Sequence, residues 1–149
     1  MASVLTVNTA ADPAGQPGSG IDKRPSAAPH QVRAPGSRQD GLGSGIVGDS
    51  IANRKLHGGD DQAVYAYARE DLDAWQTRLD RELTNGMFGE NLTTTGIDLT
   101  GCLVGERWAV GTDGLVLEVS APRTPCKTFA NWLGVPGWVK TFTTAAAPG

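Results

Sequence analysis

The chain has 149 residues, of which 13 are basic and 16 acidic, so its formal net charge is −3. This length fits one domain, and the acidic balance excludes the broad cationic face of a typical nucleic-acid-binding domain. With 20 glycines and 9 prolines, the chain is interrupted too often for a coiled coil or a bundle of long helices. No apolar run reaches the ~18 residues of a membrane helix, and no secretory signal opens the sequence, so we expect a cytoplasmic protein without a membrane partner.

The cysteine content also favours a reducing compartment. Cys102 and Cys126 are the two cysteines of the sequence, too few for the disulfide framework of a small secreted domain. They do not form a CxxC pair, so the sequence does not predict a structural zinc site. We expect two free thiols.

Residues 1–50 combine short apolar pieces with many Gly, Pro and Ser residues. Val4–Val7 predicts a first strand, and the polar residues 8–20 predict a flexible loop. Ile21–Lys23 and Gln31–Arg33 lie near prolines, and since proline cannot donate to a β-ladder, we expect them at sheet edges. The glycine-rich residues 35–49 predict a loop.

The longest segment without Gly or Pro predicts the main helix over residues 62–83. Leu72, Trp75 and Leu79 recur at helical spacing and would form one buried face. The dipeptide Asn85-Gly86 is a typical signal for the end of a helix.

Short strands and two shorter helices are predicted beyond this helix. In chain order they are a strand over 91–94, a hairpin formed by 107–110 and 115–119, a helix between Pro125 and Gly134, and a helix over 138–144. Short strands around a few helices, separated by many turns, are typical of a small β-barrel or an α+β fold. We therefore predict a mixed, β-rich fold.

Cys126 carries the strongest chemical signal. It follows the stiff segment from Pro122 to Pro125 and precedes a predicted helix. The unpaired N–H groups of a helix start and the charges of Arg123 and Lys127 favour a thiolate, which is a nucleophile and a soft metal ligand. The alternative is a small buried side chain with no chemical role.

A glycine-containing turn at His57-Gly58-Gly59 is a weaker candidate. Its backbone N–H groups can approach an anionic ligand closely, because glycine has no side chain. The alternative is a structural turn with both glycines at positive φ, after which Asp61 caps the main helix.

A second turn, over residues 86–93, presents Glu90 and Asn91 at the start of a strand. The alternative is a bulge that places Phe88 in the core. Cys102 lies among apolar residues and is interpreted as structural. The four tryptophans are interpreted as core residues, because no basic stripe accompanies them; they are Trp75, Trp108, Trp132 and Trp138.

Taken together, these stretches resemble the MOSC domain, a family named for the C-terminal domain of molybdenum-cofactor sulfurase. The resemblance covers nearly the whole chain, favours a single domain over residues 1–149, and is strongest to the stand-alone bacterial YiiM-type branch. It is carried, in order, by His57–Gly59, Ala63–Tyr67 with Arg69-Glu70, Phe88–Leu92, Gly105–Trp108 and Pro122–Cys126.

The resemblance implies a fold and an activity. The family fold is a partly closed β-barrel with a few helices, and reductase members bind a molybdenum cofactor of the molybdopterin type. YiiM-type proteins resemble reductases that cleave the N–O bond of N-hydroxylated compounds such as 6-hydroxylaminopurine. In sulfurase members the family cysteine carries sulfur as a persulfide, supplied by a domain that depends on pyridoxal phosphate, which here would belong to a separate partner.

The resemblance also implies roles for single residues. Cys126 becomes the catalytic residue and the molybdenum ligand. Cations and backbone N–H groups suit the phosphate of such a cofactor. The residues implied around the cofactor are His57, Gly58, Gly59, Arg69, Gly89, Glu90, Asn91, Arg123, Pro125 and Cys126 itself.

The sequence departs from the family pattern at three places. Ser50 follows Gly48-Asp49 where relatives commonly have arginine, and Asp60 stands where proline is common. Relatives also continue past residue 149 with further barrel strands, so we expect a barrel that lacks C-terminal elements and leaves strand edges open.

Three functions are compatible with this sequence. The first is a molybdenum-dependent oxidoreductase that receives electrons from a separate donor. The second is a carrier that accepts persulfide sulfur from a cysteine desulfurase, or holds the cofactor, without turnover of its own. The third is an inactive fragment of the family. Nucleic acid is not an expected partner of any of them.

Overall fold

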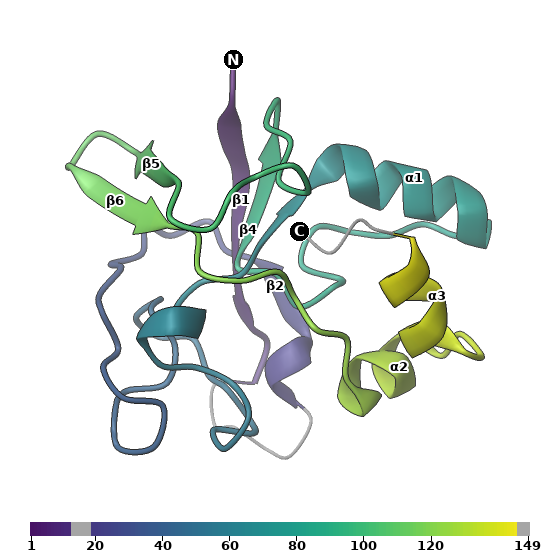
Figure 1. Cartoon of the computed structure of the whole chain (residues 1–149), viewed down its shortest axis with the longest axis horizontal. Coiled ribbons are helices and arrows are strands. Elements are labelled where there is room, and N and C mark those ends of the chain that lie inside the picture. Colours follow the sequence, from purple (N-terminus) through teal and green to yellow (C-terminus); the bar gives the residue numbers. More distant parts are fainter. Residues whose placement is uncertain (13–18, 146–149) are drawn as a thin grey trace.

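A computed structural model of the chain describes residues 1–12 and 19–145. It contains a four-stranded sheet, a separate β-hairpin and three helices (Figure 1). In sheet order the four strands are β2 (Lys23–Pro25), β1 (Ser3–Ala10), β4 (Leu92–Thr95) and β3 (Ala66–Ala68). The hairpin consists of β5 (Arg107–Val110) and β6 (Leu115–Glu118). The helices are α1 (Arg69–Leu79), α2 (Lys127–Leu133) and α3 (Trp138–Thr144).

This architecture confirms the predicted mixed, β-rich fold with a few helices. The two sheets do not close on each other within the described residues. β1 is antiparallel to both β2 and β4, whereas β3 and β4 are parallel. A parallel pair requires a crossover connection, and α1 lies in the segment between β3 and β4.

The N-terminal strand is longer than predicted. β1 runs to Ala10 and therefore includes residues 8–10, which we had expected in a flexible loop. Asn8 is fully buried there, with its side-chain amide hydrogen bonded to Thr93 at 2.9 Å. Residues 13–18, the middle of the expected loop, lie outside the described residues. The predicted edge strand at 31–33 is reduced to one bridge between Val32 and Ile46.

The main helix is shorter than predicted. α1 begins at Arg69 rather than near residue 62, because residues 66–68 form β3. It ends at Leu79 rather than at residue 83, because Asp80 adopts a left-handed conformation with φ of 50°. The backbone N–H of Asp80 donates to the carbonyl of Gln76 and closes the last turn. Leu72 and Trp75 are buried as expected. The hairpin, the stop of α2 at Gly134 and the bounds of α3 agree with the sequence prediction.

An aromatic core joins the three helices to the sheet. The rings of Trp75 and Trp138 lie 4.7 Å apart between centroids, and those of Phe88 and Phe129 lie 5.1 Å apart. Such pairs contribute about 0.5–1.5 kcal/mol each beyond the burial of their area. Two of the four tryptophans are therefore core residues as predicted. Trp132 is instead 39% exposed, and Trp108 lies on the hairpin.

A second core is polar and centres on Asp49, a loop residue whose side chain is 1% exposed. Its carboxylate accepts hydrogen bonds from Lys23 Nζ at 2.8 Å, Ser44 Oγ at 2.9 Å and Asn91 Nδ2 at 2.9 Å, and from the backbone N–H of Ala10 at 2.8 Å. Burial disfavours the charged carboxylate, but the Lys23 charge and these hydrogen bonds hold the pKa of Asp49 below its usual value. The glycine-rich loop is thereby fixed to β1, β2 and β4.

We predict that Asp49→Asn destabilises the protein by about 3–5 kcal/mol, because it leaves the Lys23 ammonium buried without a counter-charge. Urea denaturation measures this loss. The matched control is Arg24→Ala, which removes the exposed ion pair between Arg24 and Asp22 and should leave the midpoint unchanged. Equal midpoints for Asp49→Asn and the unmodified protein would contradict the assignment.

None of the helices described within residues 1–12 and 19–145 is long and apolar enough to cross a membrane.

Candidate functional site around Cys126

Cys126 occupies the position directly before α2. Its backbone is extended, with φ of −123° and ψ of 170°, and its thiol is partly buried. α2 forms here because Phe129 and Leu133 enter the aromatic core on one face, and Gly134 ends the helix with φ of 68°. Both cysteines are free thiols, as predicted.

The pKa of the Cys126 thiol is lowered from its ordinary value, whereas that of Cys102 is raised. A hydrogen bond from the His57 side chain is the main cause, and it brings the pKa to about 7 although partial burial opposes the shift. The backbone N–H of Phe129 and the positive charge of Arg123 add to the effect. Lys127 is not among the causes. Much of the Cys126 population is therefore thiolate at neutral pH.

Arg123 is held in place by two rings and a carbonyl. Its guanidinium carbon lies 4.8 Å from the Tyr65 ring centroid and 4.1 Å from that of Phe129. Nη1 donates a hydrogen bond to the backbone carbonyl of Phe88. A Cβ added to Gly89 would lie 3.8 Å from the same nitrogen, so this glycine borders the guanidinium. The cation is thereby immobilised close to the thiolate.

The glycines after His57 have a structural role that places the histidine. Gly58 and Gly59 have φ of 89° and 81°, and both are buried against the loop at residues 36–43. A Cβ at Gly58 would lie 2.8 Å from the carbonyl oxygen of Gly43, and the N–H of Gly59 donates to that oxygen at 3.0 Å. This N–H group therefore already donates a hydrogen bond within the fold. Asp61 does not cap α1, which begins after β3 at Arg69.

Glu90 and Asn91 are buried in the interior. The Glu90 carboxylate accepts hydrogen bonds from the backbone N–H groups of Gly86 at 2.6 Å and Phe88 at 3.0 Å, which fixes the turn that borders Arg123. Burial raises the pKa of Glu90. Asn91 belongs to the polar core around Asp49. Phe88 is fully buried, as the structural interpretation of this turn predicted.

Arg69 lies at the start of α1 and connects it to the segment that follows the helix. It donates to the backbone carbonyl of Leu83 at 2.9 Å and to Asn85 Oδ1 at 2.8 Å, and pairs with Asp73 at 2.7 Å. These contacts hold α1 to the segment that follows it, and the role of Arg69 toward a cofactor stays a prediction. The structure thus brings together three sequence-predicted residues, His57, Arg123 and Cys126, with Gly89 and Pro125 at their border.

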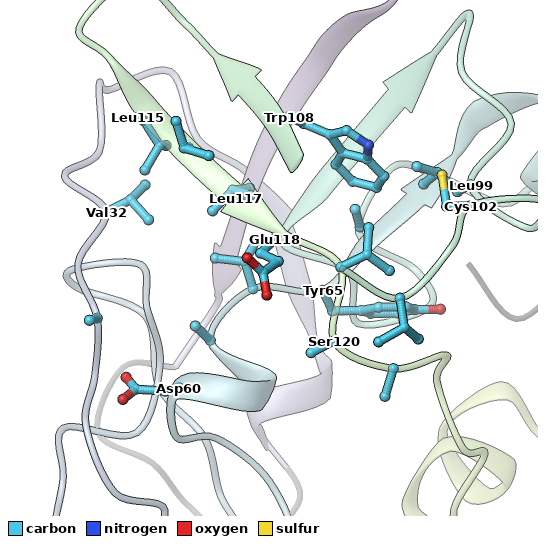
Figure 2. Close-up of a pocket in the computed structure, with 18 of the residues that line it drawn as sticks. Val32, Asp60, Tyr65, Leu99, Cys102, Trp108, Leu115, Leu117, Glu118 and Ser120 are labelled. Carbon is cyan, nitrogen blue, oxygen red and sulfur yellow. The ribbon is translucent and has the colours of Figure 1, made fainter. Parts of the chain in front are cut away.

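A cavity of about 770 Å³ lies beside this cluster, beneath the β5–β6 hairpin. Figure 2 shows Trp108, Leu117 and Tyr65 on its walls, with the Cys102 sulfur near Trp108. Cys126 does not line this cavity, but Tyr65 does, and Tyr65 is the ring that contacts Arg123. Cys102, expected to be purely structural, is therefore a wall residue. Burial and the nearby acids Glu106 and Asp98 raise its thiol pKa.

The described residues hold no group of three His, Cys, Asp or Glu side chains that could bind a metal ion. Cys126 is a single soft donor with one histidine and one arginine beside it.

Two residues of this region, Tyr65 and Trp108, were not predicted as site residues. Tyr65 was named only as part of a stretch that carries the family resemblance, and Trp108 was interpreted as a core residue. Tyr65 lies directly before β3 and packs against the aromatic core, and no periodic pattern in the sequence marks it as a contact of Arg123.

We predict that alkylation of Cys126 follows a thiolate titration with a midpoint near pH 7. His57→Ala should move this midpoint upward, toward the ordinary thiol value of about 8.5, because the donor that stabilises the thiolate is lost. Iodoacetamide rates measured from pH 5 to 10 in a Cys102→Ser background give the midpoint.

The matched control is His30→Ala, which removes the second histidine of the sequence. It should leave the midpoint near pH 7. A midpoint unchanged by His57→Ala would contradict the assigned role of His57.

Residues 53–149, well over half of the chain, match the profile of the MOSC domain. The chain therefore belongs to the MOSC domain family.

Two curated relatives show how much of each protein the sequence similarity covers. The protein YflK of Bacillus subtilis (strain 168) is 40% identical over 88 residues, which are 59% of this chain and 39% of that protein. A protein of Gibberella moniliformis described as a reductase is 35% identical over 86 residues, 56% of this chain and 15% of that protein. The matched part of the chain thus spans less than half of the length of either relative.

Among solved structures, YiiM from Geobacillus stearothermophilus is similar over 100% of this chain, with a TM-score of 0.72 and 26% sequence identity. This chain covers 65% of that structure. The YiiM-like MOSC fold inferred from the sequence is thereby confirmed.

Proposed function

We propose that this protein binds a molybdenum cofactor through the Cys126 sulfur and reduces the N–O bond of N-hydroxylated compounds. The observation that carries the proposal is the thiolate of Cys126, with its pKa lowered to about 7 between His57 and Arg123. Membership in the MOSC family and similarity to a protein described as a reductase support it.

The donor set suits such a cofactor. A soft thiolate is a suitable ligand for molybdenum, and a site with one protein donor leaves the remaining positions to the sulfur atoms of a pterin dithiolene. The immobilised Arg123 guanidinium supplies positive charge for an anionic cofactor. When bound, the cofactor would supply the two-electron redox chemistry.

The protein's own residues would then fix the reacting partners. His57 keeps the Cys126 sulfur anionic by donating a hydrogen bond to it. The reduction converts R–NHOH, two electrons and two protons into R–NH₂ and water. The N–O bond breaks and its oxygen leaves as water, while the electrons come from a separate reductase protein.

A sulfur carrier is the second candidate, and the partly exposed position of Cys126 favours it. In this reaction the Cys126 thiolate attacks the terminal sulfur of a persulfide on a cysteine desulfurase. Cys126 becomes the persulfide and the donor cysteine leaves as a thiol, so no external oxidant is needed. Pyridoxal phosphate would belong to the desulfurase.

We predict that protein purified from a host that makes the cofactor contains molybdenum, and that Cys126→Ser loses it, because a neutral hydroxyl is a hard oxygen donor and does not replace the soft, anionic thiolate. Elemental analysis and pterin fluorescence of the denatured protein measure the content. Circular dichroism checks that the variant is folded.

The matched control is Cys102→Ser, which should keep its molybdenum, since the raised pKa of Cys102 favours the thiol form. Undiminished molybdenum in folded Cys126→Ser would overturn the ligand assignment. Absence of molybdenum from every form would support the carrier or an inactive fragment, and transfer of labelled sulfur from a desulfurase to Cys126 would then identify the carrier.

A further inference from the structure

An open groove lies between α2 and α3, at the opposite end of the molecule from the β5–β6 hairpin (Figure 1). Its apolar lining comes from both helices and from the connection between them, and includes Ala130, Val135, Pro136 and Val139. Val139 is 41% exposed, so this apolar surface is open to solvent. Exposed apolar patches that are bordered by polar residues mark sites of contact with another protein.

The charged residues of the two helices and the segment before them are all basic. Residues 119–149 contain Arg123, Lys127 and Lys140 and no acidic residue, although the whole chain has a net charge of −3. Lys140 lines the groove, and Lys127 lies one helical turn before a lining residue of α2, so both exposed ammonium groups lie along it. The short helical turn Ser19–Ile21, which packs on α2, adds no acidic side chain. The groove therefore favours a partner with an acidic surface.

Trp132 supplies an aromatic anchor on α2. Its side chain is 39% exposed, and its Nε1 donates a hydrogen bond to the backbone carbonyl of Met87 at 2.9 Å. The position of the ring is thus fixed before any partner arrives, which lowers the entropy lost on binding. Tryptophan is enriched among the residues that contribute most to protein–protein affinity.

The groove lies close to Cys126 because both belong to α2. Cys126 directly precedes the helix, its thiol is partly exposed, and Lys127 is the next residue. α2 has seven residues, so its end at Gly134 is about 12 Å from Cys126 along the helix axis. A protein that covers the groove therefore comes within the length of one short helix of the thiol.

We propose that the groove between α2 and α3 is the docking site of the electron donor, a small protein whose redox centre is surrounded by carboxylates. Carboxylates of the donor pair with Lys127 and Lys140, and apolar groups between them contact Trp132 and Val139. The donor delivers two electrons singly, which with two protons convert R–NHOH into R–NH₂ and water. This inference rests on the proposed function for the use of the electrons, but docking itself does not require the cofactor.

The first test measures docking without turnover. The probe is an oxidised plant-type [2Fe–2S] ferredoxin, a small acidic electron carrier of low potential. Calorimetry should show that its Kd rises about tenfold between about 50 mM and about 300 mM salt, because salt screens the ion pairs. In Lys127→Glu/Lys140→Glu the Kd at low salt should also rise about tenfold. Circular dichroism checks that this double variant is folded.

The matched control is Arg33→Glu/Arg107→Glu. It makes the same change in net charge at two exposed residues on the hairpin side of the molecule, and should change the Kd less than about threefold. Absence of ferredoxin binding, or an equal loss of affinity in the two double variants, would overturn the inference.

A neutral pair of variants tests the apolar part of the groove. Val139→Ser removes an exposed apolar contact and should raise the Kd for ferredoxin about threefold. Val116→Ser makes the same change at a 56% exposed position of the hairpin and should leave the Kd unchanged. Equal Kd values for these two variants would contradict the assigned contact of Val139.

The second test uses turnover and separates this inference from the proposed function. Lys127→Glu/Lys140→Glu should raise the KM for reduced ferredoxin about tenfold in the reduction of 6-hydroxylaminopurine. Turnover driven by a reduced viologen dye, which needs no protein docking surface, should stay unchanged. Equal losses with both reductants would overturn the docking site and leave the reductase intact. Ferredoxin binding at the groove, in protein that shows no turnover with either reductant, would overturn the reductase and leave the docking site standing.

Discussion

The contact on which the candidate site depends is the stacking of the Arg123 guanidinium between the Tyr65 and Phe129 rings. Arg123 belongs to the segment that leaves the hairpin, Tyr65 precedes β3, and Phe129 belongs to α2. The same guanidinium donates to the carbonyl of Phe88, in a turn whose N–H groups are held by the buried Glu90 carboxylate. One cation thus joins four parts of the fold. Because a flat guanidinium can stack and donate at the same time, lysine could not replace it.

The residues predicted around the site make two kinds of contact: some hold the surrounding turns and strands in place, and others lie at the Cys126 thiol. Glu90, Asn91 and Arg69, which the family resemblance placed around the cofactor, make contacts that hold turns and strands together. His57 and Arg123 lower the pKa of the Cys126 thiol, and we expect the chemical properties of the site to depend on these three residues. The two glycines after His57 belong to the first group, because their close contacts with the loop at 36–43 determine where the histidine lies.

Local patterns predicted the elements that local interactions determine. The hairpin, the stop of α2 at Gly134 and the bounds of α3 follow from turn residues and helical spacing. Local patterns did not predict the end of α1. Asp80 adopts a left-handed conformation there, which short polar residues can adopt but which no spacing of residues in the sequence indicates. The lowered pKa of Cys126 was expected from the helix start, yet its main cause is His57, which is distant in sequence. A contact of that kind depends on the tertiary fold, and periodicity carries no information about it.

The β5–β6 hairpin makes its strand contacts within itself, and no third strand pairs with it in the described part of the chain. A side-chain hydrogen bond from Ser120 to the carbonyl of Asp61, at 2.6 Å, connects its exit segment to the short helical turn Asp60–Gln62. An isolated two-stranded ribbon is only marginally stable in water. The hairpin is therefore held to the sheet by side-chain and loop contacts rather than by strand pairing, and we expect it to belong to the part of the fold that opens at a lower free energy than global unfolding.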